Sequence, residues 1–342
     1  MMSVIDSIES GLFRIAAEPD GQPTRDALRG ADGYTIPLIA HDYPARTAQL
    51  WNAVYRSLGM PFVNCMVVAD PTHLSDIVSV FQGDRKYHGG GAGVGFKDEM
   101  LPFLHHIEPI AMSMGAVNII RRGDDGRLSG WNTDGDGFAV SLAQALGVLG
   151  KGLDGEAVVL IGAGGAANAI AFALAMRGAR LRIINRTEAK AVALADNLRR
   201  FLIARGKHAT DGITVHAERD IVAVVGDAVA IVNASWKGGG VTAAYSALAP
   251  IELPETPERV ANNHVVARSV IQAMRSDAVI ADIVLGHGAT TMLRQGKVAG
   301  HPTLDGIPMV VEQAIDAFSH VYPGTASRDR IAELMWATQR PS

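Results

Sequence analysis

The chain has 342 residues, a length that suits about two domains, and its apolar fraction of 48% is enough for a large core in each. The formal net charge is −4, so we expect no basic surface for nucleic acid. A single cysteine, Cys65, excludes an internal disulfide. The first residues place Asp6, Glu9 and Arg14 among apolar residues, a pattern unlike a secretory signal peptide, and we expect a cytoplasmic protein.

The first third of the chain alternates between apolar runs and turn residues. These runs predict helices over residues 5–16, 47–58, 73–81 and 98–107, and strands over residues 35–40, 62–69 and 116–121. A glycine cluster occupies residues 89–95. His105 and His106 are expected as an exposed pair on the helix over 98–107, and the eleven histidines show no spacing typical of metal ligands, so we expect no metal site.

The second half has a regular alternation of strands and helices. Strands are expected over residues 157–161, 180–184, 213–216, 228–233 and 278–283, and helices over residues 166–177 and 188–205. This rhythm predicts a parallel sheet that is covered on both faces. Residues 238–277 contain three prolines and are interpreted as an insertion with one helix. Two final helices, over 308–322 and 328–338, have no strand between them and are expected to pack on the first domain.

The uncharged run over residues 157–176 is long enough to span a bilayer. Three glycines interrupt it, so we interpret it as a buried strand, a turn and a buried helix, and we expect no membrane segment. The turn reads Gly162-Ala163-Gly164-Gly165-Ala166. Glycines there let the backbone approach a pyrophosphate, and the start of the helix offers unpaired N–H groups. Dinucleotide binding is favoured over the alternative, a purely structural tight turn.

The next strand ends in Asn185-Arg186-Thr187, and Lys190 follows one turn later. An acidic residue at this place binds the ribose 2′-hydroxyl of NAD, whereas an arginine accommodates the 2′-phosphate of NADP. The sequence therefore favours NADP. The alternative is a helix cap at Thr187 with solvated cations beside it.

Residues 132–137 read Asn-Thr-Asp-Gly-Asp-Gly and are similar to the start of a calcium-binding EF-hand loop. The twelfth position of such a loop holds a bidentate glutamate, and here it is Ala143. We therefore expect no calcium at this segment.

Eight short segments together resemble the shikimate dehydrogenase family. They are residues 91–97, which end in Phe96-Lys97, and residues 115–118, 130–135, 162–166, 185–187, 233–235, 305–306 and 313–314. The matches keep their order from Tyr34 to Phe318. The resemblance implies an α/β protein of two domains: a substrate-binding catalytic domain over residues 1–133, completed by C-terminal helices over 306–342, and a Rossmann NADP-binding domain over 134–305.

The resemblance also implies a function and a set of site residues. The function is the reversible, NADP-dependent reduction of 3-dehydroshikimate, or a closely related cyclic hydroxy acid, to shikimate. Lys97 corresponds to the acid/base group and Asp134 to its partner. Residues that bind the substrate would be Thr47, Asn118 and Gln313. Residues that bind the cofactor would be Gly162, Ala163, Gly164, Gly165, Ala166, Asn185, Arg186, Thr187, Lys190, Ser235, Ile283 and Gly306.

Three departures from the family pattern concern the substrate. Ala45 and Gly93 stand where the family has hydroxyl residues, and Leu285 stands where it has a tyrosine. Two lost hydroxyls predict weak activity on shikimate and better activity on a bulkier or differently substituted analogue. The open alternatives are a quinate or aminoshikimate dehydrogenase, a methylene-tetrahydrofolate type of dehydrogenase, and a non-catalytic NADP sensor. The expected partner is a small molecule, and a homodimer stays open.

Overall fold

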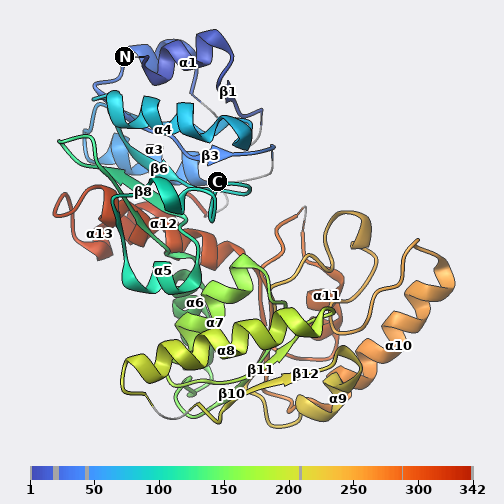
Figure 1. Ribbon diagram of the computed structural model, residues 1–342. Helices are drawn as coiled ribbons and strands as arrows, with labels where there is room; N and C mark the ends of the chain where they lie inside the picture. Colours follow the sequence, from blue (N-terminus) through green and yellow to red (C-terminus); the bar gives the residue numbers. More distant parts are fainter. Residues whose placement is uncertain (1, 18–22, 43–45, 208–209, 287, 340–342) are drawn as a thin grey trace. The chain divides into compact units, whose positions relative to one another are not determined.

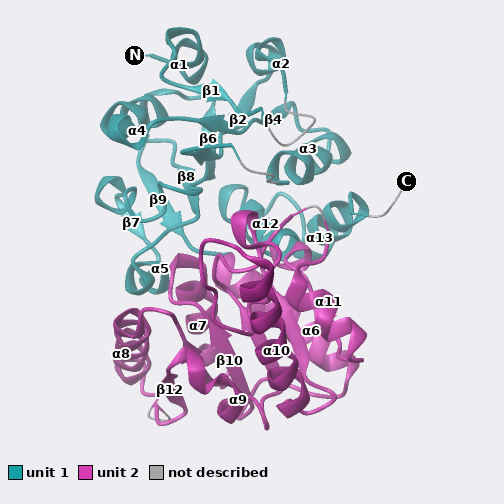
Figure 2. Ribbon diagram, turned by 90° about the vertical axis from the view of Figure 1, so that its right-hand side faces the viewer, with its two compact units in different colours: residues 1–133, 310–342 teal, residues 134–309 magenta. Residues whose placement is uncertain are grey.

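The computed structural model describes residues 2–17, 23–42, 46–207, 210–286 and 288–339. The chain divides into unit 1, residues 1–133 with 310–342, and unit 2, residues 134–309 (Figure 2). The chain returns to unit 1 between residues 309 and 310, four residues beyond the place expected from the sequence. This point lies inside one continuous helix, α12 (Ile307–Val321), so no loop marks it.

Unit 1 contains a six-stranded mixed sheet of order β4-β2-β6-β8-β9-β7 and a three-stranded sheet of order β1-β5-β3. The strands of the larger sheet are β2 (Gly33–Thr35), β4 (Phe62–Asn64), β6 (Tyr87–Gly91), β7 (His106–Ile107), β8 (Ile119–Arg122) and β9 (Leu128–Trp131). Those of the smaller sheet are β1 (Arg14–Ile15), β3 (Leu38–Ile39) and β5 (Val67–Val68).

The glycine cluster forms part of strand β6 because other backbone segments approach it closely. A Cβ on Gly90 would lie 2.2 Å from the carbonyl oxygen of Ile36, and one on Gly89 would lie 2.2 Å from that of Ile120. Any side chain at these positions would push the neighbouring backbone away. The glycines therefore let β6 pair closely with its neighbours, and the chain leads from there to Lys97.

The helices of unit 1 surround these sheets. They are α1 (Val4–Ser10), α2 (Arg25–Gly30), α3 (Thr47–Ser57), α4 (Leu74–Gly83), α5 (Pro109–Met114), most of α12 and α13 (Arg328–Ala337), with short 3₁₀ turns over Pro71–His73 and Leu101–Phe103. The C-terminal helices pack against α3. Trp51 of α3 meets Phe318 of α12 with ring centroids 5.1 Å apart, in an edge-to-face geometry that aromatic pairs favour.

The helix predicted over residues 98–107 is wrong. Pro102 lacks an N–H group and cannot sit inside a helix, and only a 3₁₀ turn forms around it. Beyond it the chain runs along β9: the N–H of His105 donates to the carbonyl of Leu128 at 2.8 Å. The expected helical histidine pair is wrong as well, because His106 belongs to strand β7.

Three other elements of unit 1 are shorter than predicted. The helix expected over 5–16 ends at Ser10, because Gly11 adopts a left-handed conformation with φ +86°, and β1 follows. The strand expected over 35–40 divides into β2 and β3, because Pro37 has no N–H group to continue the ladder. The strand expected over 62–69 likewise divides into β4 and β5, which belong to different sheets.

Unit 2 is built on a parallel six-stranded sheet of order β12-β11-β10-β13-β14-β15. Numbered within the unit, the order is 3-2-1-4-5-6, which is that of the dinucleotide-binding Rossmann fold. Its strands are β10 (Ala157–Ile161), β11 (Arg180–Ile184), β12 (Ile213–His216), β13 (Ala230–Asn233), β14 (Val279–Asp282) and β15 (Thr303–Leu304). The predicted parallel sheet is thus confirmed.

Helices cover this sheet in two groups. One contains α6 (Asp134–Val148), α7 (Gly165–Met176) and α8 (Glu188–Ala204), and the other contains α9 (Ile221–Val224), α10 (Pro257–Ala273) and α11 (Thr291–Val298). Figure 1 shows α8 running beside β11 and β12. The uncharged run over 157–176 consists of β10, a glycine turn and α7, as predicted. Within the described ranges, no helix is long and apolar enough to cross a membrane.

Residues 238–277 are not an insertion, contrary to the interpretation of the sequence. They form the crossover from β13 to β14 that parallel strands require, and α10 is part of it. Ala247, Leu248 and Val270 from this segment are 0–1% exposed and belong to the same core as Ile231. The three prolines favoured the interpretation as an insertion, whereas the segment is a buried connection between two strands.

Candidate active site and cofactor pocket

A buried polar network in unit 1 joins three side chains from distant parts of the sequence. The amide Nδ2 of Asn118 donates to Thr133 Oγ1 at 3.0 Å and to Gln313 Oε1 at 2.9 Å. The backbone N–H of Thr133 donates to Asn118 Oδ1 at 2.9 Å, and its hydroxyl donates to the carbonyl of Gln313 at 3.0 Å. Two of the expected substrate residues, Asn118 and Gln313, are therefore in contact, although 195 positions separate them.

The two expected catalytic residues adjoin this network along the chain. The carbonyl of Lys97 accepts a 2.9 Å hydrogen bond from the N–H of Val117, the neighbour of Asn118. Asp134 directly follows Thr133, begins α6 and is 7% exposed. Asp136, two residues later, forms an ion pair with Arg177 at 2.7 Å. The segment similar to a calcium loop is thus the start of a helix.

The expected substrate residue Thr47 lies at the start of α3. Thr47 is the first residue of this helix and is partly buried, and the N-terminal end of a helix favours an anion. The guanidinium of Arg46 is exposed and donates to Gln339 Oε1 at 2.8 Å. Ala45 lies outside the described residues. Gly93 follows β6, and its N–H donates to the carbonyl of Leu38 at 2.8 Å.

Unit 2 contains a pocket of about 480 Å³ at the carboxyl ends of its strands, which we call the glycine-loop pocket. It is lined by Ile161, Gly162, Ala163, Gly164, Gly165, Ala166, Asn185, Arg186, Thr187, Lys190, Glu218, Ala234, Ser235, Trp236, Lys237, Ile251, Ile283 and Val284. All the residues expected to bind the cofactor are among them except Gly306. This position is the crevice in which open parallel sheets bind ligands.

The glycines of this pocket differ in how much space a side chain would find around them. Gly162 has φ +123°, and a Cβ there would lie 2.7 Å from the carbonyl oxygen of Ala234. Gly164 and Gly165 are exposed, and a Cβ on either would meet nothing within 4 Å. Gly164 precedes α7 without a side-chain cap, so the first N–H groups of the helix face open space. An open, uncapped helix start of this kind fits a pyrophosphate.

The cationic side of the pocket follows β11. Arg186 and Lys190 are exposed, and neither forms an ion pair with another described residue. Thr187 occupies the N-cap position of α8, but its hydroxyl makes no capping hydrogen bond. The alternative of a plain helix cap therefore loses its support, and two cations remain for a phosphate.

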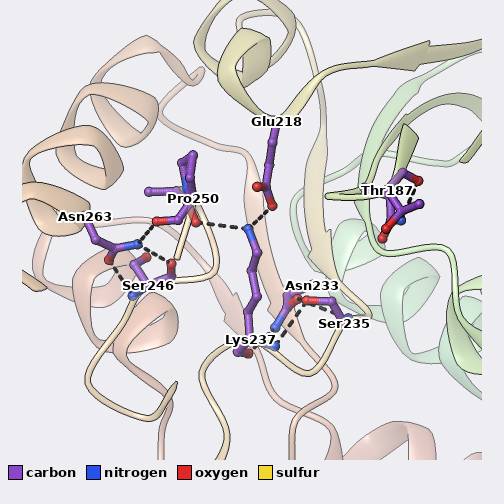
Figure 3. A network of polar contacts seen from close by, with 10 residues as sticks. Thr187, Glu218, Asn233, Ser235, Lys237, Ser246, Pro250 and Asn263 are labelled. Carbon is purple, nitrogen blue, oxygen red and sulfur yellow. Dashed lines mark hydrogen bonds and ion pairs between the residues drawn. The ribbon is translucent and has the colours of Figure 1, made fainter. Parts of the chain in front are cut away.

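Of the lining residues that the sequence did not predict, three have charged or aromatic side chains: Glu218, Trp236 and Lys237. The guanidinium of Arg186 lies over the ring of Trp236, with Cζ 5.5 Å from the ring centroid. The buried Lys237 and the partly buried Glu218 form an ion pair, seen at the centre of Figure 3. A glycine motif predicts the first strand, turn and helix of a dinucleotide fold, whereas these residues follow β12 and β13 and carry no motif of their own.

A buried carboxylate stands behind the pocket at the end of β14. Asp282 is fully buried, accepts from the hydroxyl of Thr290 at 2.6 Å and accepts from the amide of Asn233 at 2.9 Å. Burial raises its pKa to about 6, and these hydrogen bonds only partly oppose the rise. The network ties the loop after β13 to the loop after β14, both of which line the pocket.

Gly306 does not line the glycine-loop pocket but supports its wall. A Cβ there would lie 2.8 Å from the carbonyl oxygen of Ile283 and 3.0 Å from Leu285 Cδ2. Gly306 therefore permits close packing behind Ile283, which does line the pocket. Among the residues that the structure describes, no group of three or more histidine, cysteine or acidic side chains could hold a metal ion.

Comparison with known proteins identifies relatives of both units. The family described as shikimate dehydrogenase substrate binding domain matches residues 43–120, and the family described as shikimate / quinate 5-dehydrogenase matches residues 143–233. The shikimate dehydrogenase (NADP+) of Methanosarcina acetivorans is 30% identical over 270 residues, which cover 78% of this chain and 84% of the relative. The quinate/shikimate dehydrogenase (NAD+) of Corynebacterium efficiens is 32% identical over 228 residues, covering 65% and 68%.

Solved structures share the fold. A crystal structure of a shikimate dehydrogenase in complex with NADP+ superposes with a TM-score of 0.72 and covers 95% of this chain and all of the other, at 23% identity. The chain thus shares its fold with this solved structure.

Proposed function

The chain belongs to the shikimate dehydrogenase family, and from this we propose that it is an NADP-dependent dehydrogenase acting on the CH–OH group of shikimate or a closely related cyclic hydroxy acid. The observation that carries the proposal is the polar network of unit 1. Asn118 and Gln313 present amides side by side, and such groups suit neighbouring hydroxyls of a polyhydroxylated ring. A sensor would need the cofactor pocket alone, and nothing in it would require this network.

We assign proton transfer to Lys97 and Asp134. When the alcohol is oxidised, the amine of Lys97 accepts the hydroxyl proton; when the ketone is reduced, its ammonium returns a proton to the oxygen. Asp134 holds the ammonium in place. Thr47, at the start of α3, contributes a hydroxyl to the substrate carboxylate, and the helix end favours that anion.

The glycine-loop pocket binds NADP in this proposal. The bound nicotinamide supplies or accepts the hydride. Gly164, Gly165 and the first N–H groups of α7 hold the pyrophosphate, and Arg186 with Lys190 holds the 2′-phosphate. Relatives that use NADP+ and relatives that use NAD+ both occur, so these two cations are the feature that favours NADP here.

A turnover screen tests the function. Shikimate, quinate and bulkier cyclic hydroxy acids are each incubated with NADP+ or NAD+, and reduced cofactor is followed at 340 nm. We expect NADP+-dependent turnover of at least one acid. The best substrate should be an acid other than shikimate, because Ala45 and Gly93 lack hydroxyls. Tight NADP+ binding without turnover of any acid would favour the sensor instead.

The proposed enzyme acts in the cytoplasm on a small molecule. Its oligomeric state, monomer or homodimer, can be measured directly. The single thiol, Cys65, is fully buried, and burial raises its pKa to about 12, so it stays protonated and unreactive. Light scattering coupled to size-exclusion chromatography distinguishes a dimer from a monomer.

A further inference from the structure

The Glu218–Lys237 pair is a charged feature of the glycine-loop pocket that binding of phosphate does not explain. Glu218 is the one acidic side chain among the described residues that line this pocket. Its side chain is 16% exposed, and that of Lys237 is 5% exposed. Oε1 of Glu218 is buried and pairs with the ammonium of Lys237, so the exposed part of the side chain that lines the pocket lies elsewhere on the carboxylate.

Hydrogen bonds from the surrounding chain hold this pair in place (Figure 3). The ammonium of Lys237 also donates to the carbonyl of Ala249 at 3.0 Å, and the amide of Asn233 donates to the carbonyl of Lys237 at 2.9 Å. Asn263 of α10 holds the segment that contains Ala249, since its amide binds the carbonyls of Ser246 at 3.1 Å and Pro250 at 3.0 Å. The crossover from β13 to β14 thus fixes Lys237 against Glu218.

Fold stability alone is a poor reason for such a pair. Removing two charges from water costs free energy that their attraction often fails to recover. Burial lowers the pKa of Lys237, and the nearby Arg186 adds to this, while Glu218 opposes it. In a pocket for a polyanionic cofactor, an isolated carboxylate would repel the ligand. Lys237 cancels that repulsion, so the pocket can present a hydrogen-bond acceptor without a net negative charge.

The position of Glu218 indicates which part of the cofactor it faces. In a sheet of order 3-2-1-4-5-6 the dinucleotide crosses the switch point, here between β10 and β13, and one nucleotide half lies over β10, β11 and β12. Glu218 lies two positions after His216, the last residue of β12. The ribose of that half belongs to the end of β11, where Arg186 lies. The remaining donor in this half is the exocyclic amine of adenine.

We propose that Glu218, held by Lys237, accepts a hydrogen bond from the exocyclic amine of adenine and so makes the pocket selective for an adenine dinucleotide. A base with a carbonyl group at that position would place its oxygen against the carboxylate of Glu218, and two acceptors cannot form a hydrogen bond. The inference rests on the proposed use of NADP and adds a residue that decides base specificity.

Binding constants measured by isothermal titration calorimetry test it, with NADP+ and its deaminated analogue, nicotinamide hypoxanthine dinucleotide phosphate. The wild type should bind NADP+ roughly ten- to a hundredfold more tightly, the range expected for one hydrogen bond to a charged group. In Glu218→Gln the ratio should fall close to one, because the new amide can donate to the hypoxanthine carbonyl. Glu255→Gln, at an exposed site of the same unit, should keep the wild-type ratio.

The double variant Glu218→Gln/Lys237→Met guards against misfolding, because it leaves no unpaired buried charge. It should also lose the preference for adenine. An unchanged ratio in both variants, or equal binding of both dinucleotides by the wild type, overturns the inference alone. If the variants change only the ratio of the affinities for NADP+ and NAD+, the inference is also overturned, since the carboxylate then contacts the ribose. A wild type that binds neither dinucleotide overturns the proposed function and this inference together.

Discussion

Gly162 and Gly164 are two positions apart, but alanine should have different effects at the two sites. It should lower the stability at Gly162 and weaken NADP+ binding at Gly164. Gly162 has φ +123°, and a Cβ would lie 2.7 Å and 2.9 Å from the carbonyl oxygen and carbon of Ala234. Both atoms are backbone and cannot swing away. Gly164 has φ −91° and ψ −173°, which any residue adopts, and its Cβ would meet nothing within 4 Å.

The magnitudes follow from this geometry. An L residue in the conformation of Gly162 costs about 1–3 kcal/mol of unfolding free energy before the steric clash is added. For a unit the size of unit 2, each kcal/mol lowers the Tm by about 2–4 °C. Gly164→Ala should keep the Tm or raise it slightly, because alanine reduces the entropy of the unfolded chain. Its methyl group, however, occupies the space through which a pyrophosphate reaches the helix, and a lost charged contact weakens NADP+ binding roughly ten- to a hundredfold.

Differential scanning calorimetry gives the Tm of each variant, and titration calorimetry gives the Kd for NADP+. We expect Gly162→Ala to melt earlier than the wild type, and Gly164→Ala to melt like the wild type but bind NADP+ weakly. Wild-type affinity in Gly164→Ala would show that the dinucleotide does not approach the glycine loop. An unchanged Tm in Gly162→Ala would refute the argument from the contact with Ala234.

Three further predictions concern the reaction, the cofactor and the pH dependence of stability. Lys97→Ala should lose about a hundredfold or more in kcat and keep its Kd for NADPH, because the proton transfer disappears and the cofactor pocket does not change; near-normal turnover would remove Lys97 from the mechanism. Arg186→Ala should lose most of the preference for NADPH over NADH, about ten- to a hundredfold in Kd, since the 2′-phosphate loses a charged contact; equal use of both cofactors by the wild type contradicts the assignment. The pKa of Asp282 is raised to about 6, so the folded state holds a proton that the unfolded state releases, and the wild type loses stability as the pH rises from about 4 to 6. Asp282→Asn lacks this titration, and in urea unfolding its stability relative to the wild type should increase by about 2 kcal/mol between pH 4 and pH 7; a constant difference would show that the carboxyl is not perturbed.

The sequence by itself determined the nucleotide-binding half of the fold. From β10 to α7 the strand, the glycine turn and the helix are contiguous, and each is specified by residues within a few positions of it. The same holds for β11 and α8, where predicted and observed bounds agree to within a residue. Unit 1 was harder to predict because its strands are short, and Pro37 and Pro102 interrupt patterns that otherwise look continuous.

Only the tertiary structure decided which distant residues meet. Gln313 reaches Asn118 because α12 returns to unit 1, and Lys97 adjoins them through a backbone hydrogen bond to Val117. Glu218 and Lys237 pair because β12 and β13 both end at the edge of the sheet where the pocket lies. Periodicity and turn residues act over a few positions along the chain, whereas these contacts depend on strand order and on how buried segments pack, which no local pattern encodes.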